Sequence, residues 1–141
     1  MLKPFWVDLH IHTALSPCGS LEMGAPEIVS AARKAGIDVI GIADHNTCDN
    51  FQAVYEASDG DPVVLPCIET QSAEDIHVLT VFPDFETAMA YKDWLWQKIM
   101  PIKNDVDYFG YQVVLDHCNN ILREEETLLI QGSGYEVDQI V

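Results

Sequence analysis

The stretch that decides the fold is Val39–Asn46, which reads VIGIADHN. A short apolar run is followed at once by an acid, a histidine and an amide. Such a run is typical of a strand buried in a parallel sheet. Because active sites of parallel α/β folds lie at the carboxyl edge of the sheet, Asp44 and His45 are candidate site residues. The alternative is that Asp44 caps a turn and His45 faces solvent.

Working outward from this strand, apolar periodicity predicts further elements on both sides. Upstream, residues 5–11 alternate as a strand, and residues 26–36 have helical spacing between a proline and a glycine. Downstream we expect a helix opening at residues 49–52, a strand at 63–68 ending at Glu69, a strand at 76–82 and a helix at about 85–99. Strands that alternate with helices predict βαβ units and an α/β fold with a parallel sheet or barrel.

The last third of the chain carries weaker signals. Residues 111–115 predict a strand, and residues 123–126 either the end of a helix or a loop. Ser133–Glu136 has the Ser-x-x-Glu form of a capping box, which predicts a helix start. Because little more than one turn follows, we expect residues 1–141 to be a single domain truncated at its C-terminal end. The alternative is that the last residues form a frayed tail and that the Ser-x-x-Glu pattern is there by chance.

Composition excludes several classes of protein. The net charge is −16, from 23 acidic and 7 basic residues, which disfavours binding to nucleic acid. The four cysteines include no Cys-x-x-Cys pair, so neither a zinc clip nor a disulfide scaffold is expected. The sequence shows neither a membrane-length apolar stretch nor a leader, and we expect a cytoplasmic protein.

Metal-ligand residues recur where strands end. His10 and His12 are two apart on a strand, so both imidazoles project from one face. Glu69 ends an apolar strand, and His77 lies within another. Each signal alone also fits a surface or core residue, but together with His45 they fall at one predicted edge. Imidazole nitrogen with carboxylate oxygen suits Zn, Mn or Fe, and a bound cation lowers the pKa of water to make a nucleophile.

The ordered motifs resemble the PHP (polymerase and histidinol phosphatase) family. The resemblance rests on residues 8–13 (DLHIHT), 41–47 (GIADHNT) and 68–69 with 77–79, and it spans roughly residues 5 to 83. It implies a distorted (β/α)7, TIM-like barrel with parallel strands, of which this chain is an incomplete part. It also implies phosphoester hydrolysis at two or three divalent metal ions (Zn, Mn or Fe). By position, the implied catalytic and metal-binding residues are His10, His12, His45, Glu69 and His77, with Glu69 a bridge between ions and Asp44 a further candidate ligand.

The chain departs from the family pattern in two places. Where the family has Ser-Asp-Gly after the first histidines, this chain has Ser16-Pro17-Cys18-Gly19, so the expected carboxylate is missing. Glu22, by folding back, and Cys18, through a thiolate, are the candidate replacements. The family's later His-Pro-like and Asp-x-His motifs have no counterpart here. His117 is a candidate for a further site residue, and the alternative is that it is a surface or structural histidine.

The sequence therefore predicts a metal-dependent phosphoesterase of the PHP type that acts on a small phosphorylated molecule. One alternative is a metal-binding or regulatory module that has lost catalysis, which the missing carboxylate favours. Another alternative is an amidohydrolase-like metal hydrolase, but such an enzyme would require a lysine ligand on a middle strand. Only Lys92, Lys98 and Lys103 lie mid-chain, and none is in a strand-like setting. The sequence does not determine the substrate, the metal or the oligomeric state.

Overall fold

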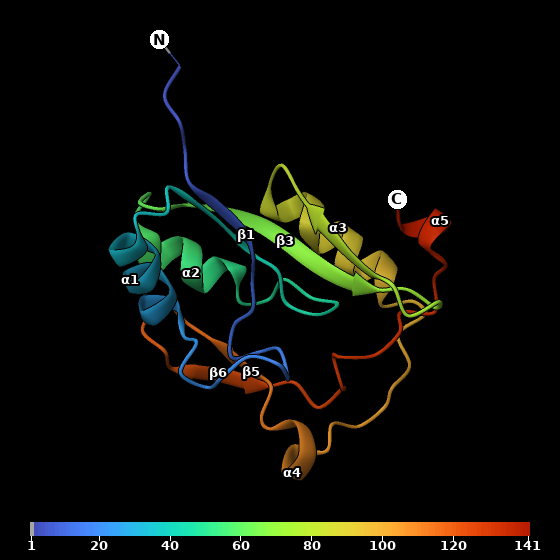
Figure 1. Ribbon diagram of the computed structural model, residues 1–141. Helices are drawn as coiled ribbons and strands as arrows, with labels where there is room; N and C mark the ends of the chain where they lie inside the picture. The colour runs from blue at the N-terminus through green and yellow to red at the C-terminus, as the bar shows by residue number, and fades with distance from the viewer. Residues whose placement is uncertain (1) are drawn as a thin grey trace.

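A curled four-stranded sheet with helices packed against it forms the body of the protein (Figure 1). The computed structural model describes residues 2–141. The sheet has the order β1-β2-β3-β4, and a separate two-stranded hairpin is made by β5 and β6. The strands are β1 (Val7–Ile11), β2 (Val39–Ile42), β3 (Val63–Gln71), β4 (His77–Val81), β5 (Val113–Leu115) and β6 (Ile121–Glu124). The helices are α1 (Ala25–Ala35), α2 (Phe51–Ser58), α3 (Phe85–Leu95), α4 (Val106–Phe109) and α5 (Val137–Ile140).

The first three strands are parallel, as the sequence predicts, and they lie close together at Gly41. Val39 pairs with Val7 on one side and with Val63 on the other. A β-carbon at Gly41 would lie 2.6 Å from the carbonyl oxygen of Leu9 and 2.8 Å from the sulfur of Cys67. Gly41 is therefore needed for this close packing.

The prediction of an all-parallel sheet is wrong for β4. This strand runs antiparallel to β3, with Glu69 opposite Leu79. Only residues 72–76 connect the two strands. A parallel neighbour needs a crossover of a dozen or more residues, so this connection can only form a hairpin. The mixed α/β class is confirmed, and the incomplete TIM-like barrel stays a prediction.

Helices α1, α2 and α3 begin within one residue of, or inside, the ranges that the sequence predicts, whereas α4 was not predicted. Pro26 occupies the first turn of α1, and Gly36 ends that helix in the left-handed conformation with φ 71°. In α2, Phe51 and Val54 are buried, whereas Tyr55 is 53% exposed. Helix α3 ends at Leu95, before the predicted boundary near residue 99.

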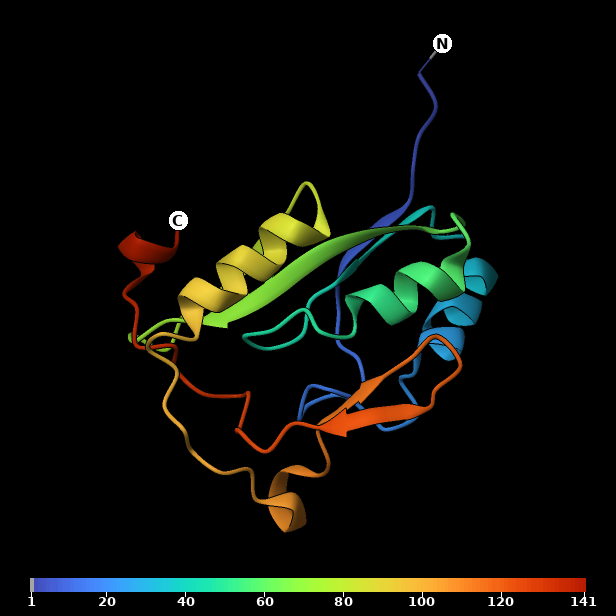
Figure 2. The same cartoon turned by 180° about the vertical axis from the view of Figure 1, so that it is seen from behind.

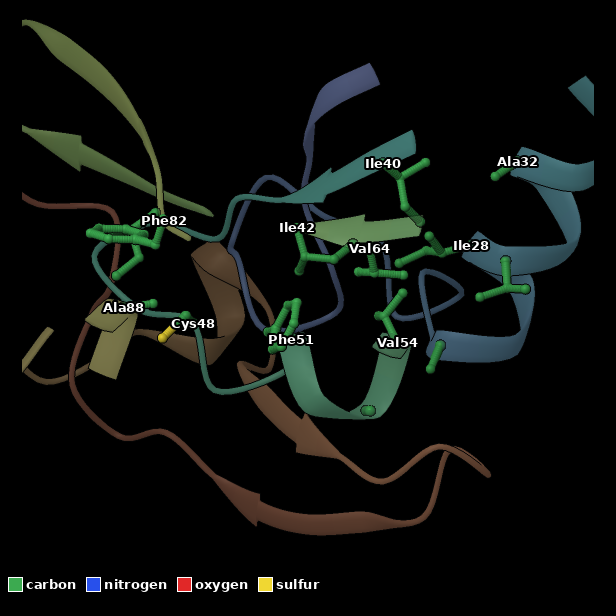
Figure 3. Packing of buried hydrophobic residues seen from close by; sticks show 14 of the residues in the cluster. Ile28, Ala32, Ile40, Ile42, Cys48, Phe51, Val54, Val64, Phe82 and Ala88 are labelled. Atoms are coloured by element: carbon green, nitrogen blue, oxygen red, sulfur yellow. The ribbon is translucent and has the colours of Figure 1, made fainter. Parts of the chain in front are cut away.

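One apolar cluster connects the sheet to the helices (Figure 3). Ile40 and Ile42 of β2 are fully buried and lie in it with Ile28 of α1 and Val54 of α2. The same cluster continues to Ala88 of α3. Because β2 packs into this core, its carboxyl end is held in a fixed position.

The β5–β6 hairpin lies on the far side of α2 from β3 (Figures 1 and 2). The strand predicted at residues 111–115 is confirmed in its last three positions, whereas Ile121–Glu124 is a strand and not a helix end. A helix does start near the predicted capping box. Its N-cap is Glu136, which makes a box with Gln139, while the hydroxyl of Ser133 accepts from the Tyr135 amide.

Within residues 2–141, no helix has both the length and the apolar character that crossing a bilayer requires.

Candidate metal centre

Four imidazoles converge on the carboxylate of Glu69. Oε2 of Glu69 lies 3.0 Å from Nε2 of His10, 3.1 Å from Nε2 of His12 and 3.5 Å from Nδ1 of His45. Oε1 lies 2.7 Å from Nδ1 of His77. The rings of His12 and His45 stack with centroids 4.8 Å apart, and His77 meets His45 edge-on at 5.5 Å. The five residues that the sequence singled out therefore lie around one point.

Strand pairing places His45 beside Glu69. Gly41 pairs with Leu65 in the parallel ladder, and the same offset continues past the end of β2 to pair His45 with Glu69. The Glu69 amide donates to the carbonyl of Asp44, and the Asn46 amide donates to the carbonyl of Glu69. The backbone itself thus fixes these two side chains next to one another.

The other histidines reach the same point from the two outer strands. His10 lies in β1 and His12 follows that strand, so the two share a face. His77 pairs with Gln71 across the hairpin, which puts it diagonally opposite Glu69 on the same face of the sheet. The antiparallel direction of β4, which the sequence analysis missed, is what brings His77 back to Glu69.

Burial governs the electrostatics of the cluster. The side chain of Glu69 is only 6% exposed, and burial alone would raise its pKa. Hydrogen bonds from His77 and His10 are the largest effects that oppose burial, and the pKa of Glu69 lies below its usual value. Burial lowers the pKa of His12, and it lowers that of His45 to about 4. His12 and His45 are therefore neutral near pH 7, as metal ligands must be.

The donor set fits a divalent metal. Ligand atoms that share one ion at about 2.0–2.2 Å lie roughly 3 Å from each other, close to the distances around Glu69. Two triads, His10-His12-Glu69 and His45-Glu69-His77, each have ligand atoms within 4.8 Å of one another. Nδ1 of His45 is buried and makes no hydrogen bond within residues 2–141. A cation would give this nitrogen a partner.

Asp44, a candidate ligand from the sequence, faces away from these triads. Its carboxylate is fully buried and accepts from the amide and hydroxyl of Thr13, both at 2.8 Å, and from the hydroxyl of Ser16 at 2.7 Å. Burial raises the pKa of Asp44, against the effect of these hydrogen bonds. Its contacts anchor the loop that follows His12.

Ser16 contacts the histidine cluster, which the sequence alone did not predict. Its hydroxyl donates to Asp44, accepts from the His45 amide at 3.1 Å and lies 3.1 Å from Nδ1 of His12. This arrangement was not detectable from spacing, since two of the three partners of Ser16, Asp44 and His45, lie about thirty residues further along the chain.

The two candidate replacements for the missing carboxylate differ in position. Cys18 forms a third triad with His12 and His45, again with ligand atoms within 4.8 Å. Burial raises the pKa of its thiol. Glu22 is exposed and lines a surface hollow with Leu21, Glu27 and Asn119, outside the three triads found in residues 2–141.

His117 does not join the centre. Its Nδ1 pairs with Glu56 at 3.1 Å in a hollow between α1 and α2, in agreement with the surface alternative. Two of the three mid-chain lysines that an amidohydrolase-like site could use are engaged elsewhere. Lys92 of α3 pairs with Asp49, and Lys98 lies over the ring of Tyr135.

Comparison with solved structures gives a partial likeness to a protein from Bifidobacterium adolescentis ATCC 15703. That protein, solved at 2.40 Å, is provisionally described as a metal-dependent phosphoesterase. The two chains are 26% identical with a TM-score of 0.48, and the match covers 69% of this chain. It covers 35% of the other, so this chain spans about a third of that protein's length. No protein-family model and no curated protein matches the chain.

Proposed function

We propose that this chain carries the metal-binding part of a divalent-metal-dependent phosphoesterase of the PHP type. The convergence of four imidazoles on Glu69, at 2.7 to 3.5 Å, supports the proposal. His10, His12, His45, Glu69 and His77 would hold two or three ions of Zn, Mn or Fe. When bound, such ions lower the pKa of water and neutralise charge on a phosphate ester.

The charges of the centre favour a phosphorylated substrate. Imidazoles that coordinate a metal are neutral and Glu69 contributes one negative charge, so two divalent ions would leave the centre positive. That positive site would lie in a chain whose formal net charge, without metal, is −16. A phosphate ester would be drawn to this point and repelled from most of the remaining surface.

Exposure separates two roles among the ligands. The side chains of His10 and His77 are 46% and 43% exposed, whereas those of His45 and Glu69 are 4% and 6% exposed. The buried pair fixes the position of the centre, and the exposed pair leaves a side that a small substrate can approach. Both oxygens of Glu69 face imidazoles, which suits a bridge between two ions.

A metal-binding module without catalysis is the second candidate. The observation that favours it is Cys18, which stands where a carboxylate is expected and leaves the centre with one carboxylate, Glu69, in its triads. Metal content and turnover, measured separately, distinguish the two functions.

The test uses the chain as it stands and two matched variants. Glu69→Gln keeps the shape of the side chain but removes the carboxylate, whereas Glu56→Gln makes the same change on the exposed face of α2. We expect Glu69→Gln to weaken Zn²⁺ and Mn²⁺ binding by more than about 100-fold, and Glu56→Gln to leave it unchanged. Hydrolysis of 4-nitrophenyl phosphate and of its bis ester should require added metal and should be lost in Glu69→Gln.

Each outcome distinguishes a different case. Metal binding that is unaffected by Glu69→Gln would contradict the proposed centre. Metal bound at Glu69 without turnover of either ester would support the binding module instead.

A further inference from the structure

We propose that Cys18 is a metal ligand of this centre, and that its thiolate shares an ion with the imidazoles of His12 and His45. The inference rests on the proposed metal centre and adds a sulfur donor to it. It implies that the site selects thiophilic ions, Zn²⁺ above Mn²⁺, because thiolates prefer softer cations than carboxylates do.

The first support is the position of the thiol. Sγ of Cys18 and one ring nitrogen each from His12 and His45 lie within 4.8 Å of one another. Two imidazoles and a thiolate form a common donor set for zinc, and a solvent molecule or Glu69 could complete it. Cys118 is also exposed, yet it belongs to none of the triads found in residues 2–141.

The second support is the unpartnered nitrogen of His45. This side chain is 4% exposed, and its Nδ1 has no hydrogen-bond partner within residues 2–141. Its nearest charged neighbour is Oε2 of Glu69, at 3.5 Å. A buried polar atom without a hydrogen-bond partner destabilises the folded state. A cation bound by His45 would satisfy this nitrogen.

The third support is the loop that carries Cys18, which is fixed by buried contacts. The Gly19 amide donates to the carbonyl of Ser16 at 2.8 Å. A β-carbon at Gly19 would lie 2.1 Å from the carbonyl oxygen of Thr13, so only glycine permits this tight winding. The hydroxyl of Ser16 is in turn held by Asp44. Cys18 is therefore presented to the cluster by a constrained turn.

Binding involves a simple exchange of bonds. The S–H bond of Cys18 breaks, its proton leaves to solvent, and the sulfur donates an electron pair to the cation. No oxidation or reduction takes place, so the proposal needs no co-reactant.

The experiment compares four forms of the chain, wild type, Cys18→Ser, Cys18→Asp and Cys118→Ser, titrated with Co²⁺ and Zn²⁺. Wild type and Cys118→Ser should show the near-ultraviolet thiolate-to-cobalt charge-transfer band, and Cys18→Ser should lack it. Zn²⁺ should also protect Cys18, identified by mass spectrometry, from iodoacetamide while Cys118 stays reactive.

Cys18→Asp tests selectivity directly, because it restores the carboxylate that the family pattern expects. We expect this variant to bind metal without the charge-transfer band. Its affinity for Zn²⁺ relative to Mn²⁺ should fall at least about tenfold, because sulfur is replaced by oxygen.

The possible failures are distinguishable from one another. If Glu69→Gln abolishes binding but Cys18→Ser leaves the cobalt spectrum and the Zn²⁺ affinity unchanged, the proposed centre stands and the role of Cys18 is overturned. Alkylation of Cys18 at the same rate with and without Zn²⁺ would also overturn it. If no form binds metal, both proposals fail.

Discussion

The hydroxyl of Ser16 has one proton, and its neighbours determine where that proton goes. The ionised carboxylate of Asp44 can only accept, so at 2.7 Å it takes the proton of Ser16. The Ser16 oxygen must then accept from Nδ1–H of His12. This leaves Nε2 of His12, the atom that faces Glu69, with its lone pair free to bind a metal.

Removing this hydroxyl should therefore weaken metal binding. We expect Ser16→Ala to lower Zn²⁺ affinity by about 10- to 100-fold, since it releases the ring of His12 and its tautomer. The affinity can be measured by competition with a chromophoric chelator. Ser30→Ala, on the exposed face of α1, is the matched control and should change nothing. Equal affinities in the two variants would contradict the role of Ser16.

The four cysteines should differ in reactivity. Burial raises the pKa of Cys48 to about 12 and that of Cys67 to about 11. At pH 8 these two thiols would be ionised to only about one part in 10⁴ and one part in 10³, respectively. In metal-free folded protein we expect iodoacetamide to modify the exposed Cys18 and Cys118 and to spare the buried pair, as peptide mass spectrometry would show. Rapid modification of Cys67 in folded protein would contradict its buried position.

At the scale of residues, the sequence predicted the members of the cluster better than the side chains that hydrogen-bond to them. His10, His45 and Glu69 could be found because strand ends and period-two spacing are local signals. Asp44 was a candidate ligand by the same reasoning, but it is turned inward by Thr13 and Ser16. Such hydrogen bonds join residues distant in the chain, and no local pattern encodes them.

Among the elements, α2 is linked to both the loop after β1 and the β5–β6 hairpin through Asn50. This buried N-cap residue donates to the hydroxyl of Thr13 and to the carbonyl of Val113, and it accepts from the amide of Leu115. Three separate segments thus depend on one side chain. The link also holds the first residue of the loop that carries Ser16 and Cys18.

Truncating this side chain should destabilise the protein. We expect Asn50→Ala to lower the free energy of unfolding by at least about 2 kcal/mol, because it leaves buried polar groups without partners. Urea denaturation monitored by tryptophan fluorescence would measure the loss. Gln52→Ala removes an exposed amide from the same helix and should cost less than about 0.5 kcal/mol. Similar losses in both variants would contradict the link.

Elements themselves were predictable where apolar periodicity is strong. The three parallel strands and α1 follow from their spacing and from Pro26 and Gly36. The antiparallel direction of β4 follows from the short connection of residues 72–76. Apolar periodicity, from which the strand was predicted, carries no information about strand direction. The β5–β6 hairpin was not fully predictable, since the side chains of β6 are exposed and give no apolar pattern.

For the whole molecule, the dominant long-range effect is the net charge of −16. Seven basic residues cannot pair with 23 acidic ones, so repulsion between carboxylates opposes the compact state. Salt reduces the Debye length from about 30 Å at 0.01 M to about 8 Å at 0.15 M.

Salt should therefore stabilise the metal-free protein. We expect the urea midpoint to rise when ionic strength increases from about 0.01 to 0.15 M in the presence of a chelator. Sodium, potassium and choline chlorides should act alike, because the effect is screening and not binding of one ion. A midpoint that is constant or falls with salt would mean that attractive pairs such as Lys92–Asp49 outweigh the repulsion.

The wide separation of the imidazoles along the chain also bears on how the protein is assembled. His10 belongs to the first strand and His77 to the fourth, and the carboxylate between them is set by backbone pairing. A chain emerging from the ribosome cannot present this set until the fourth strand has followed. Metal would thus bind late in biogenesis, after the four-stranded sheet has formed, and would not nucleate the folding of that sheet.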